Sequence, residues 1–133
     1  MTMKTVLIID SDLGFVFWLG RILQGAGCEV IPVKGFAEAS VLLSELNTGV
    51  DLLIVDSRLA GVVDFADEQR RSRPNLKILV AIGDKDTPAG QIQPADVIAR
   101  KPPHLDDTAA SLWLRMVEHA LGSLRQQSSG GST

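Results

Sequence analysis

Two aspartates and one lysine stand where the chain can place them together. Asp10 follows an apolar run of four residues, Asp56 follows another, and Lys101 comes shortly after a third, shorter run. If these runs are parallel strands, the side chains that follow them meet at one edge of the sheet. Neighbouring carboxylates attract a hard cation such as Mg²⁺, which takes oxygen ligands. A carboxylate beside a metal and a lysine can attack a phosphoryl group, because both cations offset the charge of the transferring oxygens.

The elements that must position these residues are short strands alternating with helices. Apolar runs predict strands at 4–10, 28–33, 51–56, 77–82 and 96–99. Helical spacing and caps predict helices at 12–26, 36–46, 61–73 and 106–125. The segment 83–94 contains Pro88, Gly90 and Pro94, so we expect a shortened or irregular fourth helix there. Alternating strands and helices indicate an α/β domain with a parallel sheet.

One proline constrains the order of the strands. Pro32 cannot donate to a ladder, so its strand belongs at an edge of the sheet. This favours the doubly wound, flavodoxin-like order 2-1-3-4-5, in which strands one and three are neighbours. Asp10 and Asp56 then lie side by side at the switch point.

The helices are expected to pack on this sheet through apolar faces. On the first helix we expect that face to consist of Phe15, Trp18, Leu19, Ile22 and Leu23. On the last helix we expect it to consist of Leu105, Ala109, Leu112, Met116 and Ala120. Val16 and Phe17 fall outside the first of these faces, so they either form a surface for a partner or a second copy, or extend the core around the helix.

Composition excludes several classes of protein. The 133 residues are 45% hydrophobic, which is enough for one core, and no apolar stretch has the roughly 18 residues of a membrane span. The net charge of −3 disfavours nucleic-acid binding, and the basic cluster Arg70, Arg71 and Arg73 is interpreted as a solvated helix end. The single cysteine, Cys28, excludes an internal disulfide and suits the cytoplasm. The acidic loop after Asp10 and the lack of a glycine-rich phosphate motif disfavour a flavin or nucleotide cofactor.

Over residues 4–125 the chain resembles the receiver domain of two-component response regulators. Asp10 matches the first acid of that family, and Asp56 matches its phosphoacceptor aspartate. Lys101-Pro102 matches the Lys-Pro turn, and Leu59-Ala60-Gly61 stands where the family usually has Met-Pro-Gly. The resemblance implies a phosphoryl acceptor, not an enzyme, with weak self-dephosphorylation at most. It also implies Mg²⁺ held by Asp10 and Asp56, and a histidine kinase or phosphotransfer protein as donor.

The chain departs from the family pattern at three positions. Ser11 replaces the second metal-binding acid, Ile82 replaces the Ser/Thr that contacts the phosphoryl group, and Ile98 replaces the aromatic switch residue. Losing a carboxylate should weaken Mg²⁺ binding. Asp12 is either a substitute ligand or, with more support, a helix N-cap. These departures favour an alternative function, a pseudo-receiver that binds proteins without phosphorylation.

We place the domain at residues 1–125, and 126–133 has the polar, Gly/Ser-rich composition of a flexible tail or linker. No direct contact with nucleic acid or membrane is expected of this domain. A homodimer is compatible with the sequence.

Overall fold

The computed structural model describes residues 3–46, 49–83 and 96–122. Within these residues the strands are β1 (Thr5–Ile9), β2 (Glu29–Val33), β3 (Leu52–Asp56), β4 (Lys77–Ile82) and β5 (Val97–Arg100). The helices are α1 (Leu13–Gly25), α2 (Phe36–Leu46), α3 (Val62–Ser72) and α4 (Asp107–Leu121). The predicted irregular fourth helix at 83–94 and the predicted tail at 126–133 lie largely or wholly outside the described residues.

The strands form one parallel sheet in the order β2-β1-β3-β4-β5, as predicted, with the strand of Pro32 at an edge. β2 lies at the edge and pairs with β1, where Pro32 is opposite Ile8. β1 also pairs with β3, so that Ile9 lies opposite Val55. The residues that directly follow these two positions, Asp10 and Asp56, therefore lie at the same edge of the sheet.

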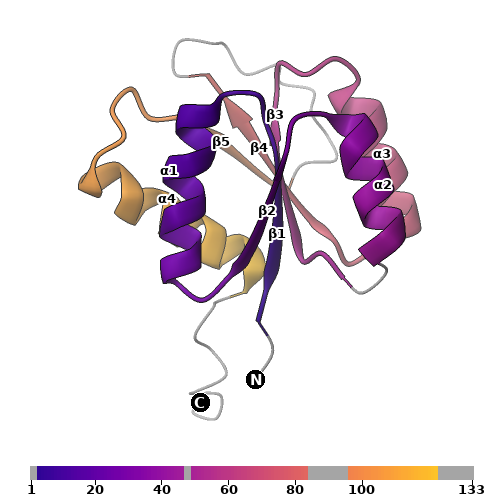
Figure 1. The fold of residues 1–133 in the computed structure, drawn as a ribbon, viewed down its shortest axis with the longest axis horizontal. Helices are drawn as coiled ribbons and strands as arrows, with labels where there is room; N and C mark the ends of the chain where they lie inside the picture. The colour runs from indigo at the N-terminus through magenta and orange to yellow at the C-terminus, as the bar shows by residue number, and fades with distance from the viewer. Residues whose placement is uncertain (1–2, 47–48, 84–95, 123–133) are drawn as a thin grey trace.

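Helices cover both faces of the sheet. α1 and α4 lie on one side of the strands, and α2 and α3 lie on the other (Figure 1). Because side chains alternate along a strand, Val6 and Ile8 pack beneath α1 and α4, whereas Leu7 and Ile9 pack beneath α2 and α3. All four side chains are completely buried. Burial on both faces explains why the central strands are continuous apolar runs instead of alternating patterns.

Most predicted boundaries hold within a residue or two. β2 begins at Glu29 instead of Cys28, and β5 is shifted by one residue to Val97–Arg100. The largest difference is at α4, which ends at Leu121 instead of 125. Gly122 ends it because its φ of +82° is left-handed, which costs glycine little and other residues more.

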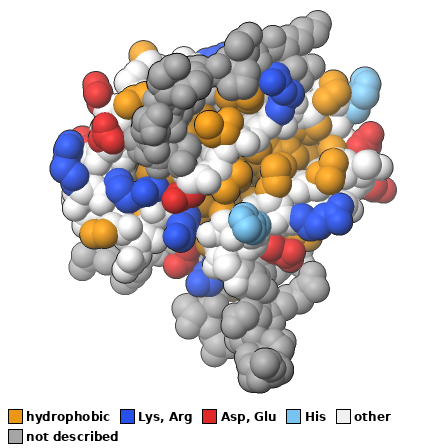
Figure 2. Space-filling view, turned by 180° about the vertical axis from the view of Figure 1, so that it is seen from behind, with side chains coloured by type: hydrophobic (Ala, Val, Ile, Leu, Met, Phe, Trp, Pro, Cys, Tyr) orange, Lys and Arg blue, Asp and Glu red, His pale blue; other side chains and the backbone are white. Residues whose placement is uncertain are grey.

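The predicted apolar face of the last helix was partly wrong. Leu112 is 51% exposed and Leu105, before the helix begins, is 44% exposed. The buried residues of α4 are Ala109, Trp113, Val117 and Ala120. Leu112 immediately precedes the buried Trp113, and one position corresponds to about 100° around a helix. Placing Leu112 in the apolar face therefore turned the predicted face away from the sheet. Hydrophobic side chains are visible on the back of the molecule (Figure 2).

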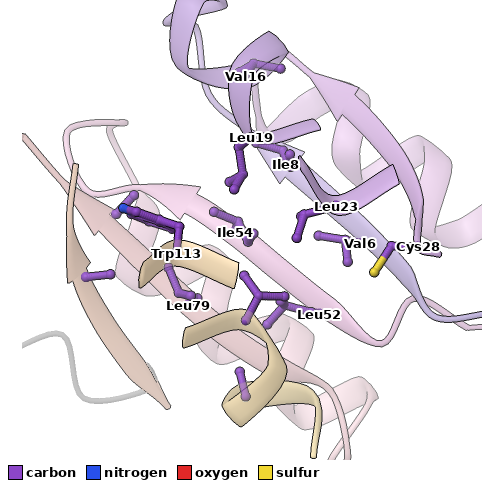
Figure 3. Close-up of a cluster of buried hydrophobic side chains, with 14 of the residues drawn as sticks. Val6, Ile8, Val16, Leu19, Leu23, Cys28, Leu52, Ile54, Leu79 and Trp113 are labelled. Carbon is purple, nitrogen blue, oxygen red and sulfur yellow. The ribbon is translucent and has the colours of Figure 1, made fainter. Parts of the chain in front are cut away.

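The prediction of a partner surface at Val16 is also wrong. Val16 is only 3% exposed and belongs to the core cluster between the sheet and α1 and α4, which also contains Leu19 and Ile8 (Figure 3). Core packing therefore extends around α1, which was the alternative interpretation. Phe17, the next residue, is 63% exposed, as expected for a surface position.

The basic cluster at the end of α3 is less solvated than its composition suggested. Arg70 forms an ion pair of 2.6 Å with Asp96, which also accepts a hydrogen bond from the backbone N–H of Ile78. Arg73 donates to the carbonyl of Leu43 on α2. These two arginines therefore tie α3 to neighbouring elements. No helix among the described residues is long and apolar enough to cross a membrane.

Candidate functional site

The structure brings Asp10, Asp56 and Lys101 together at the carboxyl edge of the sheet. The Lys101 Nζ lies 2.8 Å from Asp10 Oδ2 and 3.7 Å from Asp56 Oδ2. All three residues are buried, with 2%, 2% and 6% of their surface exposed. Two carboxylates and one ammonium therefore share a site largely withdrawn from water, where their interactions are stronger than at the surface.

Lys101 directly follows β5, and its backbone and its side chain are both held in place by contacts. Its N–H donates to the carbonyl of Ile82 at 2.7 Å, which extends the pairing of β5 with β4. Its ammonium lies 4.8 Å from the centre of the Phe15 ring, a cation–π contact. The Phe15 ring in turn packs edge-on against Trp113. The lysine thus lies over Phe15 of α1, whose ring is supported by Trp113 of α4.

The two carboxyl groups differ in their protonation equilibria. Burial raises the pKa of Asp10 above its ordinary value, although Lys101 and the backbone N–H of Asp12 favour the charged form. Burial acts in the same direction at Asp56. There, however, hydrogen bonds from Arg58 and the positive charges of Lys101 and Arg58 outweigh burial and lower the pKa. Asp56 is therefore the group held more firmly as a carboxylate.

Arg58 is the site residue that sequence reasoning missed. Its backbone N–H donates to Asp56 Oδ1 at 3.0 Å, and its side chain contacts both carboxylate oxygens at 3.3–3.4 Å. An aspartate often accepts a hydrogen bond from the backbone two residues later. Applied to Asp56, this local rule could have predicted the hydrogen bond from the Arg58 backbone N–H, which brings the arginine side chain close to the carboxylate.

Asp12 caps α1 and also borders the site. Its Oδ1 accepts a hydrogen bond from the Phe15 N–H at 3.3 Å, while its Oδ2 lies 3.8 Å from the Lys101 Nζ. Its side chain is 47% exposed, in contrast to that of Asp10. The capping role predicted for Asp12 is confirmed, and its carboxylate contributes negative charge at the mouth of the site.

We expect Asp12→Ala to lower the free energy of unfolding by about 1 kcal/mol, the usual value of an N-cap. Asn caps a helix as well as Asp, so Asp12→Asn should retain nearly all of the stability. Urea unfolding of both variants and the wild type measures the difference. An equal loss in both variants would show that the charge of Asp12, and not its cap, stabilises the domain.

The three positions that depart from the receiver pattern have different environments. Ser11 is exposed beside Asp10, and its hydroxyl adds no carboxylate to the site. Ile82, at the end of β4, is only 3% exposed and offers no hydrogen-bond donor from its side chain. Ile98 on β5 is 44% exposed.

The donor set fits a weakly held Mg²⁺. Asp10 Oδ2 is buried and lies 2.8 Å from the Lys101 Nζ, which also lies 3.7 Å from Asp56 Oδ2. One or two carboxylates, with water completing the shell, are the usual protein ligands of Mg²⁺. No group of three or more acidic, His or Cys residues in the described part of the chain is arranged to hold a metal. Asp10 and Asp56 are the buried carboxylates of this site, and Lys101 and Arg58 lie against them.

Similarity to known proteins comes from structure, not from sequence. No protein-family model and no curated protein matches the chain. A response regulator from Thermotoga maritima has a TM-score of 0.72 at 22% identity, covering 92% of this chain and all of its own. A CheY-like response regulator receiver domain protein from Methanospirillum hungatei JF-1 has 0.73 at 20%, covering 95% and 99%. The beryllofluoride-activated NtrC4 receiver domain dimer has 0.74 at 20%, covering 90% and 98%. The chain thus has the fold of response regulator receiver domains.

Proposed function

We propose that this chain, which has the receiver fold, accepts a phosphoryl group on Asp56 in phosphorelay signalling. The observation that carries the proposal is the buried Asp56 carboxylate, held ionised at the end of β3 with Lys101 3.7 Å away. An ionised carboxylate is the nucleophilic form of this side chain. The receiver domain in this proposal comprises residues 1–125, and the donor is a histidine kinase or a phosphotransfer protein.

The chemistry is a displacement at phosphorus. An oxygen of Asp56 forms the new P–O bond while the P–N bond of phosphohistidine breaks, and its electron pair remains on the imidazole. When the other ring nitrogen carries a proton, the imidazole leaves as a neutral molecule. Lys101 stabilises the negative charge on the transferring oxygens, and the chain does not act as an enzyme on a separate substrate.

Mg²⁺ belongs to this proposal, with Asp10 and Asp56 as its protein ligands. When bound, the metal adds positive charge against the phosphoryl oxygens. Ser11 supplies no third carboxylate, and one unit-charge pair at about 4 Å contributes roughly 4 kcal/mol at an effective dielectric of 20 before desolvation is subtracted. We therefore expect weak binding, in which Asp12 contributes charge more than coordination.

A direct experiment tests the proposal. The protein is incubated with Mg²⁺ and acetyl phosphate or phosphoramidate, and its intact mass is measured beside a competent receiver domain. We expect the mass of one added phosphoryl group, which EDTA should prevent. Failure to gain that mass, while the control domain does, would refute phosphoryl acceptance.

A second candidate function is a pseudo-receiver that binds another protein without phosphorylation. It is favoured by Ile82, which supplies no hydroxyl at the site, and by the exposed apolar side chains of Ile98 and Leu112. In this case Asp56→Asn should leave the affinity for a partner unchanged. A clear loss of affinity in that variant would count against the pseudo-receiver.

The exposed Phe17 on α1 is the remaining candidate for contact with the donor or a second copy. It borders a hollow of about 290 Å³ between α1 and β2, whose lining includes Gln24, Val30 and Pro32. Dimerisation of the NtrC4 receiver domain shows that one protein of this fold can self-associate. A homodimer of this chain, which sedimentation would detect, therefore remains part of the proposal.

A further inference from the structure

Arg58 covers the same carboxylate oxygens that the proposed chemistry requires. Its Nε lies 3.4 Å from Asp56 Oδ1 and its Nη2 lies 3.3 Å from Asp56 Oδ2. The Asp56 side chain is 3% exposed, whereas the Arg58 side chain is 58% exposed. The guanidinium therefore extends from solvent over a buried anion.

The position of the guanidinium conflicts with a second cation at Asp56. Lys101 already lies 3.7 Å from Oδ2. With Arg58 on both oxygens, a divalent ion approaching this carboxylate meets positive charge from two sides and finds the lone pairs engaged. A phosphorus atom approaching either oxygen meets the same obstruction. The Arg58 side chain and an incoming metal or phosphoryl group should therefore compete for the Asp56 carboxylate, so that only one of them contacts it at a time.

The geometry also indicates that this contact opens easily. The backbone N–H of Arg58 holds the loop at 3.0 Å from Asp56, independently of the side chain. The side-chain contacts are longer, at 3.3–3.4 Å, and the Arg58 side chain is 58% exposed; ion pairs at such positions are weak. The side chain can therefore leave Asp56 without unfolding the loop that carries it.

We propose that Arg58 is a removable cap on Asp56, which competes with Mg²⁺ and delays phosphoryl uptake. It takes the place of part of the positive charge that a metal would supply, in a site that has only two buried carboxylates. The metal competition stands on the contacts of Arg58 alone. The effect on phosphoryl uptake rests on the proposed function.

The test compares Mg²⁺ affinity in wild type, Arg58→Ala and Arg58→Gln. Titration with MgCl₂ is followed by the amide ¹H–¹⁵N chemical shifts of Asp10 and Asp56. Removing the cap should lower Kd by about 3- to 10-fold in Arg58→Ala, with a smaller change in Arg58→Gln, which retains a shorter polar side chain. In the wild type, the Arg58 Nε–H signal should shift along the same titration.

Arg71→Ala is the matched control. It removes the same charge from an exposed position in the last turn of α3, whereas the loop containing Arg58 precedes the start of that helix. Its Mg²⁺ affinity should equal that of the wild type. Equal affinities in Arg58→Ala and Arg71→Ala, or no Mg²⁺ binding by Arg58→Ala, would overturn the cap.

Phosphoryl uptake separates this inference from the proposed function. If both hold, Arg58→Ala should gain the phosphoryl mass from acetyl phosphate faster than the wild type. If Arg58→Ala binds Mg²⁺ more tightly and neither protein gains that mass, the cap is supported and phosphoryl acceptance fails. If the wild type is phosphorylated and Arg58→Ala shows neither higher affinity nor higher rate, the cap fails and the proposed function stands.

Discussion

Asp56→Asn should abolish phosphoryl uptake from acetyl phosphate. The amide has nearly the same size and can still accept the Arg58 N–H that approaches Asp56 Oδ1 at 3.0 Å. It lacks the negative charge that makes the carboxylate a nucleophile, however, and it cannot form the acyl phosphate. Intact mass spectrometry with Mg²⁺ present measures the loss, and circular dichroism establishes that the variant is folded.

Asp51→Asn provides the control for this experiment. Asp51 lies just before the opposite end of β3, where it accepts a hydrogen bond from the Thr5 N–H at 2.8 Å. Its substitution removes the same charge far from Lys101 and should leave uptake intact. Phosphoryl uptake that persists in Asp56→Asn would place the acceptor at another residue.

Trp113→Ala should lower the free energy of unfolding by about 3–5 kcal/mol, the usual cost of deleting a buried aromatic side chain. Trp113 is 2% exposed, and its ring packs edge-on against Phe15 at 5.2 Å between centroids. Its side chain extends from α4 into the buried cluster that contains Ile54 and Leu79 of the sheet (Figure 3). Urea denaturation followed by circular dichroism measures the change without depending on tryptophan fluorescence.

Leu112→Ala, one residue away on the same helix, is the matched control. Because Leu112 is 51% exposed, its truncation should change stability by no more than about 0.5 kcal/mol. The two results together test which stripe of α4 faces the sheet. A larger loss in Leu112→Ala than in Trp113→Ala would restore the face expected from the sequence.

The strand order could be predicted because it depends on local chemistry. Pro32 lacks a backbone donor, so its strand is confined to an edge, and the apolar run Leu52–Val55 is typical of a strand covered on both faces. Once the order is known, Asp10 and Asp56 must share one edge of the sheet. The approach of Lys101 to both followed from the same topology.

The helix faces were harder to predict because the α/β core surrounds part of each helix. Val16 on α1 belongs to the same buried cluster as residues of β1, β3 and α4, and α1 also packs against β2. The buried arc of α1 is therefore wider than a simple stripe. On α4, Leu112 and Trp113 are adjacent and both apolar. In the structure Trp113 is the buried one, packed against Phe15 within the core cluster.

The sequence by itself predicted the strands and the edge position of β2, because strand periodicity and proline chemistry are local. The full order is the doubly wound pattern that this edge position fits, and it places Asp10, Asp56 and Lys101 at one edge of the sheet. Tertiary structure alone decided how the charges in that site pair. The Lys101 ammonium rests on the Phe15 ring and 2.8 Å from Asp10, while Arg58 covers Asp56. Such pairing depends on the directions of long side chains from separate elements, and burial strengthens it by excluding water. Those directions set the charge around Asp56, and therefore the chemistry that we propose for it.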